Sequence, residues 1–311
     1  MQPEDYQRIG KINLKYVISK LHREEPWLKI KFVLFATLLF IISIIPTACA
    51  RNTSTKLRIV TSTSLIECIV REVGGSHVEV TDLVPPNQHP GNFDIKPGDI
   101  EKLANAKLLL LHGYPGESWS DRLITSADNP NLVVEKVGVE GNWMIPSVQI
   151  TATEKIAGIL SEIDPENAST YTMSAENYIE IILNKQIEIN DELIKADVPD
   201  VNVIASVRQA DFLEWAGFDV ISTYGGTTSL TPQLIQDLVD LGKAENVALI
   251  VNNIQDGKDA GKAIAEEIGA ENLNLSNFPG GLDDTGTWEK AIDRNITILL
   301  DAVARFRAGI I

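Results

Sequence analysis

The chain has few cysteines and histidines, the side chains that form disulfides and most often serve as nucleophiles and general bases. Its 311 residues include only 2 cysteines and 4 histidines, and aromatic residues make up 6%. With Cys49 and Cys68 alone, a disulfide framework is excluded. Cys68 lies among apolar residues at helical spacing, so we expect it to pack in a helix instead of reacting.

Basic residues and catalytic motifs are scarce as well. Against 43 Asp and Glu stand 27 Lys and Arg, and the net charge of −16 argues against nucleic acid as a partner. The patterns GxSxG, HExxH, GxGxxG and GxxxxGK[ST] are absent. Without a nucleophile–base pair either, the sequence predicts that the protein is not an enzyme.

The N-terminal segment predicts a compartment. Residues 1–31 are net basic, and residues 32–50 are apolar and uncharged. This charge asymmetry is typical of a secretion signal. The run ends in the small residues 47–50, which resemble a bacterial lipobox and predict lipidation of Cys49. The alternative is an uncleaved anchor, because the run can just span a bilayer. Both place the rest of the chain outside the cytoplasm and tethered to the membrane by segment 1–50.

The remaining chain alternates strand-like and helix-like patterns around one long helical stretch. This predicts an α/β fold with two lobes, each with a mostly parallel sheet flanked by helices, joined by a long linking helix. Pro165 is expected to restart that helix with Asp164 as its cap. The predicted domains are 51–150, 151–196 and 197–311. The predicted strands are 57–63, 77–84, 107–113, 131–137, 201–207, 218–225, 247–253 and 271–277.

Polar residues gather at the carboxyl ends of these strands, where ligands bind in open parallel sheets. Arg208 is a candidate partner for a carboxylate or phosphate, although a plain surface role is equally compatible. Asp256 could supply negative charge or cap a helix. Amides suit the orientation of a small organic ligand. The predicted ligand-binding residues are Asn92, Asn142, Trp143, Ser206, Arg208, Gln209, Asn252, Asn253 and Asn277.

Two histidines follow predicted strands of the first lobe and suggest a metal site. His89 and His112, with Asp94 supplying oxygen, have the donor atoms that zinc or another transition metal prefers. In the alternative interpretation, His89 is a solvated loop residue and His112 bonds to loop backbone.

Several stretches resemble one family in order and spacing: VTDLVPPNQHPGNFDIKPGDIEKLANAKLLLLHG, GNWMIPSVQITATEKIAGILSEIDPEN and VIASVRQADFLEWAGF. Over residues 57–305 the chain resembles the zinc/manganese-type (cluster A-I) solute-binding proteins of ABC transporters. The resemblance implies a transported metal such as zinc or manganese and no catalytic cofactor. It also implies an ABC permease with its ATPase as partners and a periplasmic or other extracytoplasmic location.

The metal ligands depart from that family, which usually binds its ion with three histidines and a carboxylate. The matching positions here hold Gly91, Gly141, Ser206 and Asn277. Three hypotheses therefore stay open. The protein is a divergent transition-metal receptor, a receptor for a metal chelate or small anionic organic ligand, or a non-transport adhesin or accessory lipoprotein.

Overall fold

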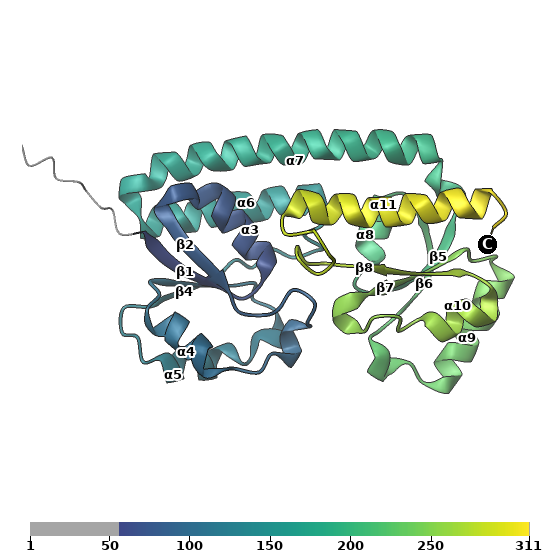
Figure 1. Ribbon diagram of the computed structural model, residues 1–311, viewed down its shortest axis with the longest axis horizontal. Helices are drawn as coiled ribbons and strands as arrows, with labels where there is room; N and C mark the ends of the chain where they lie inside the picture. The colour runs from purple at the N-terminus through teal and green to yellow at the C-terminus, as the bar shows by residue number, and fades with distance from the viewer. Residues whose placement is uncertain (1–55, 311) are drawn as a thin grey trace, which may run out of the picture. The chain divides into compact units, whose positions relative to one another are not determined.

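Two four-stranded sheets, each wholly parallel, form the framework of the chain (Figure 1). The computed structural model describes residues 56–310. The first sheet has the strand order β2-β1-β3-β4 and the second has the order β6-β5-β7-β8. Each sheet with its helices is called a lobe below. The predicted fold class, two parallel α/β lobes joined by a long helix, is confirmed.

The first lobe contains β1 (Leu57–Thr61), α3 (Ser64–Gly74), β2 (Val78–Asp82), α4 (Pro97–Ala104), β3 (Leu108–Leu111), α5 (Ser120–Ala127) and β4 (Val133–Lys136). Two helices follow it, α6 (Pro146–Ile163) and α7 (Ala168–Ala196). The second lobe contains β5 (Asn202–Ser206), α8 (Ala210–Trp215), β6 (Asp219–Tyr224), α9 (Pro232–Ala244), β7 (Leu249–Asn253), α10 (Lys262–Ile268), β8 (Glu271–Leu275) and α11 (Trp288–Arg307).

All eight predicted strands are present, and each is shorter than predicted. The third strand shows why. It was expected over 107–113 but pairs with its neighbours only over Leu108–Leu111. Beyond that point Gly113 has a φ of 94°, a left-handed conformation that turns the chain out of the sheet. Apolar pattern marks the centre of a strand, whereas local backbone geometry sets its end.

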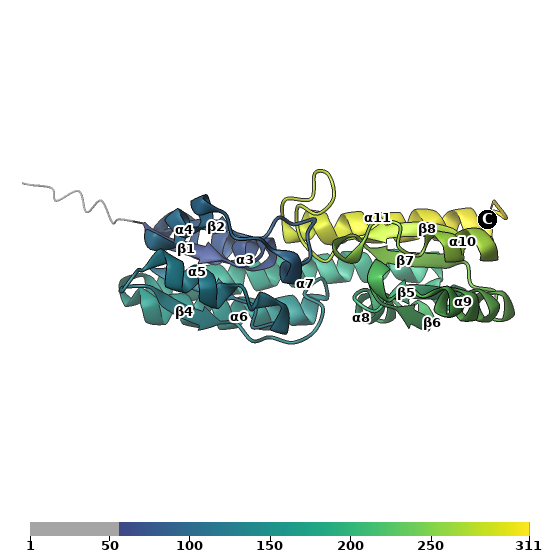
Figure 2. The same ribbon diagram turned by 90° about the horizontal axis from the view of Figure 1, so that it is seen from below.

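Helices cover both faces of each sheet (Figures 1 and 2). On the side of α7 lie α3 and α6 in the first lobe and α8 and α11 in the second. The opposite faces carry α4 with α5 and α9 with α10. The four leucines of β3 are all buried, and they alternate between the two cores: Leu108 and Leu110 face one, Leu109 and Leu111 the other. A strand buried on both faces reads as a continuous apolar run for this reason.

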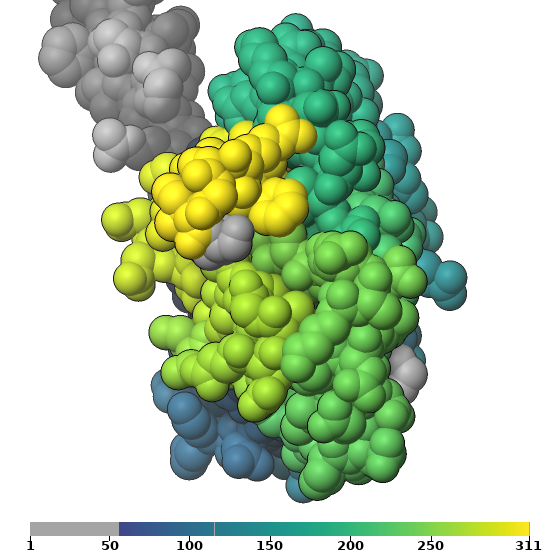
Figure 3. All heavy atoms as spheres, turned by 90° about the vertical axis from the view of Figure 1, so that its right-hand side faces the viewer, coloured from purple at the N-terminus to yellow at the C-terminus, as the bar shows by residue number. Residues whose placement is uncertain are grey.

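The linking helix α7 has 29 residues and is therefore about 44 Å long. It lies along both lobes in Figure 1, and Figure 3 shows its far end beside α11 at the end of the second lobe. Pro165 opens a short 3₁₀ turn before α7. The predicted cap differs, because the carboxylate of Asp164 accepts hydrogen bonds from the side chains of Asn167 (2.8 Å) and Tyr171 (2.6 Å) and from no backbone N–H.

The predicted packing of Cys68 is confirmed. Its side chain is buried in α3, and burial, reinforced by Glu67 and Glu289, raises the pKa of the thiol to about 12. Within residues 56–310 no helix combines the length and the apolar character that crossing a bilayer needs. Segment 1–50, with the lipidation predicted at Cys49, lies outside the described residues and stays a prediction, as do the domain boundaries.

Candidate functional site

A cleft of about 530 Å³ lies between the two lobes. Loops that follow β2, β3 and β4 line it from the first lobe, and loops that follow β5, β7 and β8 line it from the second. Parallel sheets bind ligands at this edge, beyond the carboxyl ends of the strands. The polar and aromatic side chains on its walls include His89, Tyr114, Asn142, Trp143, Arg208, Asn253, Gln255 and Asn277.

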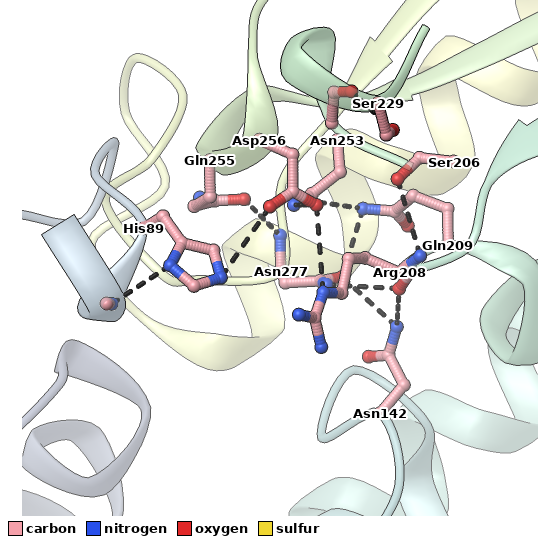
Figure 4. Close-up of polar contacts among 12 residues, drawn as sticks. His89, Asn142, Ser206, Arg208, Gln209, Ser229, Asn253, Gln255, Asp256 and Asn277 are labelled. Carbon is pink, nitrogen blue, oxygen red and sulfur yellow. Dashed lines mark hydrogen bonds and ion pairs between the residues drawn. The ribbon is translucent and has the colours of Figure 1, made fainter. Parts of the chain in front are cut away.

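An amide network holds the second-lobe wall in place (Figure 4). The Nδ2 atoms of Asn142 and Asn277 both donate to the backbone carbonyl of Arg208, each at 3.1 Å. Asn277 Oδ1 accepts from Asn142 at 3.1 Å and from Gln209 at 3.0 Å. Gln209 Nε2 also donates to Asn253 Oδ1 at 3.1 Å. These bonds fix the loop that carries Arg208, whereas the buried Oε1 of Gln209 has no hydrogen-bond partner among the described residues.

Asp256 lies between the side chains of His89 and Arg208, the two basic residues of the cleft lining (Figure 4). Its Oδ1 is 3.7 Å from His89 Nε2, in the opposite lobe, and its Oδ2 is 3.8 Å from Arg208 Nε. Both distances exceed that of a hydrogen bond. Asn253 Nδ2, at 3.0 Å from Oδ2, anchors the carboxylate. The Arg208 side chain is 57% exposed and donates no hydrogen bond to a described residue.

The ring of His89 rests on the backbone of Gly91. His89 Nδ1 accepts from the Gly91 N–H at 2.9 Å, and a Cβ at residue 91 would lie 3.0 Å from that same nitrogen. The ring thus occupies the space that a side chain at position 91 would need. A neutral imidazole whose Nδ1 accepts carries its proton on Nε2. His89 therefore presents an N–H donor to the cleft.

His112 is buried behind the cleft wall, 1% exposed. Its Nε2 is 2.6 Å from the Thr63 hydroxyl, and its ring stacks on Tyr114 and meets the edge of Trp143, with centroids 4.5 and 4.4 Å apart. Loss of hydration lowers the pKa of His112 to about 3. The ring is therefore neutral, and it supports two side chains that do line the cleft.

The predicted metal trio of His89, His112 and Asp94 does not form a cluster. His112 is enclosed by aromatic rings, and Asp94 is exposed outside the cleft lining. Among residues 56–310, no group of three or more His, Cys, Asp and Glu side chains is placed to hold a metal ion. The predicted trio is wrong because side chains that follow neighbouring strands can point in different directions even when their loops lie at the same edge of the sheet.

Two predicted ligand-binding residues have structural roles. Asn252 is buried. Its Oδ1 accepts hydrogen bonds from the Tyr224 hydroxyl and the Gly261 N–H, and its Nδ2 donates to the Leu273 carbonyl, which fixes β7 against its neighbours. Ser206 is buried, and its hydroxyl accepts from the Arg208 backbone N–H at 3.3 Å. Asn92 is exposed outside the cleft lining. By contrast Asn142, Trp143, Arg208, Asn253 and Asn277 line the cleft, and Gln209 bonds to its walls. Their part in ligand binding stays a prediction.

Sequence reasoning missed Val207. This side chain lies in the cleft wall and is 53% exposed. The signal was available, since Val207 stands between Ser206 and Arg208 in a loop that follows a strand. An apolar residue in a strand-like pattern is ordinarily assigned to the core, and only its placement reveals that it faces the cleft.

Comparison with known proteins identifies the relatives of the chain. A family model described as "ZnuA: Zinc-uptake complex component A periplasmic" matches residues 59–302. The "Manganese-binding lipoprotein MntA" of Halalkalibacterium halodurans is 25% identical over 236 residues, which cover 68% of this chain and 78% of that protein. The "Iron-binding protein YfeA" of Yersinia pestis is 23% identical over 238 residues, covering 71% and 76%.

Solved structures share the fold. A crystal structure of ZnuA aligns with a TM-score of 0.67 and 22% identity over 80% of this chain and 99% of that one. The solute-binding protein FpvC of Pseudomonas aeruginosa, in complex with Ni²⁺, aligns with a TM-score of 0.69 and 23% identity over 80% and 97%.

Proposed function

The chain belongs to the zinc-uptake complex component A family, and on that premise we propose that it is the solute-binding subunit of an ABC importer whose cargo contains a transition metal. The observation that carries this proposal is the cleft between the lobes, which lies where parallel sheets bind ligands. Relatives named for manganese and for iron support the same class of cargo.

The proposed mechanism is capture and delivery. Cargo enters between the lobes and contacts the side chains of Arg208, His89 and the cleft amides. The loaded protein then docks on a membrane permease, whose cytoplasmic ATPase drives import. The protein works outside the cytoplasm, held at the membrane by its N-terminal segment. No chemical step on the cargo is part of this mechanism.

The lobes are expected to move little during capture. Hydrogen bonds already join them beside the cleft. In addition to the bonds of Asn142 to the second lobe, they include Ser64 Oγ to the Pro279 carbonyl (2.7 Å), Gln255 Nε2 to the Pro86 carbonyl (2.7 Å) and Trp288 Nε1 to the Trp143 carbonyl (2.8 Å). With a stiff linking helix, this favours small tilts and loop adjustment over wide hinge closure.

Metal analysis of the purified protein tests the proposal. Protein secreted or extracted without chelators, and then desalted, should retain a transition metal at a stoichiometry approaching one per chain. Adding the retained metal, as the free ion or as the complex that co-purifies, should raise the melting temperature of the protein. The expected size follows from mass action, because a ligand at 100 times its Kd stabilises the native state by about 2.7 kcal/mol.

Magnesium serves as the control, because it prefers oxygen ligands and retains its water. The proposal fails if no transition metal co-purifies and none stabilises the protein, whether added as the free ion or as a complex.

A further inference from the structure

We propose that the cleft takes its metal as a complex with a small carboxylate-bearing chelator, and not as the bare ion. This inference rests on the proposed function and names the form of its cargo. It starts from a mismatch: the walls of the cleft offer hydrogen-bond donors where a bare ion would need several anionic or imidazole ligands.

The protein lacks a set of direct metal ligands here. Zinc in protein sites takes three or four ligands from Cys, His, Asp and Glu. Among the described residues no such group of three exists. His89 is no exception, because its Nδ1 accepts from Gly91, which leaves the proton on Nε2, the nitrogen that faces the cleft. Binding a metal through Nε2 would require the other tautomer and the loss of that backbone hydrogen bond.

The donors that are present suit a carboxylate. Arg208 has a planar fork that binds carboxylates through two parallel hydrogen bonds. Arg208 Nε lies 3.8 Å from one carboxylate oxygen of Asp256, and His89 Nε2 lies 3.7 Å from the other. Neither contact is a hydrogen bond. Both donors are therefore available to an anionic group that enters the cleft.

The size and walls of the cleft also suit an organic molecule. Pockets for small molecules have volumes of roughly 300–1,000 Å³ and mostly apolar walls with a few polar groups. The cleft has about 530 Å³, and Val207, Leu65, Pro90 and Phe278 belong to its lining. An exposed valine next to Arg208 contributes nothing to a bare cation, but it can pack against the carbon skeleton of a chelator.

Asp256 gives the cleft both signs of charge. Its carboxylate, with the exposed Glu140 and Asp211 also in the lining, opposes a free organic anion. In a metal complex the bound cation neutralises part of the chelator's negative charge, while carboxylate oxygens remain available to Arg208. The complex is therefore repelled less by the acidic groups of the cleft than the free chelator is. Asp256 would then select against the empty chelator and would not itself ligate the metal.

Isothermal titration calorimetry with defined probes tests this assignment. The probes are zinc chloride, zinc–citrate, zinc–nitrilotriacetate and citrate alone, added to the wild-type chain. We expect each zinc complex to bind at least about tenfold more tightly than zinc chloride or citrate alone. Arg208→Gln should weaken both complexes by about tenfold or more, the range of a hydrogen bond to a charged group, and leave zinc chloride unchanged. Arg122→Gln, on the exposed face of α5, is the matched control and should change nothing.

Asp256→Asn separates the two modes of binding. If Asp256 only selects against anions, its removal preserves or tightens the binding of the complexes. Loss of zinc binding in this variant would make Asp256 a direct ligand and overturn the inference. It is also overturned if zinc chloride binds as tightly as both complexes, if Arg208→Gln has no effect on them, or if citrate alone binds as well as zinc–citrate. The absence of binding by every zinc-containing probe also overturns the inference for zinc, whereas the proposed function fails only when no transition metal co-purifies with the protein and none stabilises it.

Discussion

His112 is a titratable side chain that burial keeps neutral. Its pKa falls from 6.5 to about 3 on folding. Between these values the unfolded chain binds a proton that the folded chain excludes. The free energy of unfolding therefore decreases as the pH falls from 6.5 towards 3, by up to about 1.4 kcal/mol per pH unit from this residue. Urea denaturation between pH 4 and 7 should show the slope, and His112→Gln should reduce it.

The comparison concerns the slope and not the absolute stability, because His112→Gln also removes the stacking on Tyr114. His77→Gln, at a half-buried position, is the control and should leave the slope nearly intact. An unchanged slope in His112→Gln would mean that the ring is protonated inside the fold.

At the scale of the element, α7 is stabilised by one face. Ile182 and Ile189 are buried against the rest of the molecule, whereas Ile187 on the same helix is 62% exposed. The three have the same intrinsic helix propensity, so substitution by alanine isolates the contribution of packing. Ile182→Ala should lower the free energy of unfolding by about 2–4 kcal/mol. Ile187→Ala should change it by less than about 0.5 kcal/mol.

Chemical denaturation monitored by circular dichroism measures both variants. Equal losses in the two variants would mean that the buried face of α7 contributes no more to stability than its exposed face.

At the scale of the described chain, the two lobes share one hydrophobic core. Ile59 and Leu110 of the first sheet belong to the same buried cluster as Val203 and Leu249 of the second, joined through helices that include α7. A continuous core couples the lobes energetically, so neither can lose its packing alone. Differential scanning calorimetry should therefore record a single transition with equal calorimetric and van't Hoff enthalpies. Two separated transitions would show that the lobes unfold independently.

The fold was predictable because its signals are local. A buried strand such as Leu108–Leu111 and the apolar spacing of α7 are visible in a few consecutive residues. The alternation of such patterns specifies parallel sheets covered by helices, and composition argues against nucleic-acid binding. The position of the cleft followed from the same pattern, because parallel strands place their carboxyl ends at one edge.

The contacts inside the cleft were not predictable in that way. The sequence alone determined which segments are strands and helices, because hydrophobic periodicity is written along the chain. Only the tertiary structure decided that His89 faces Asp256 of the other lobe and that His112 lies behind Tyr114. Pairings of this kind depend on how loops distant in sequence are oriented, and that orientation comes from packing of the whole core.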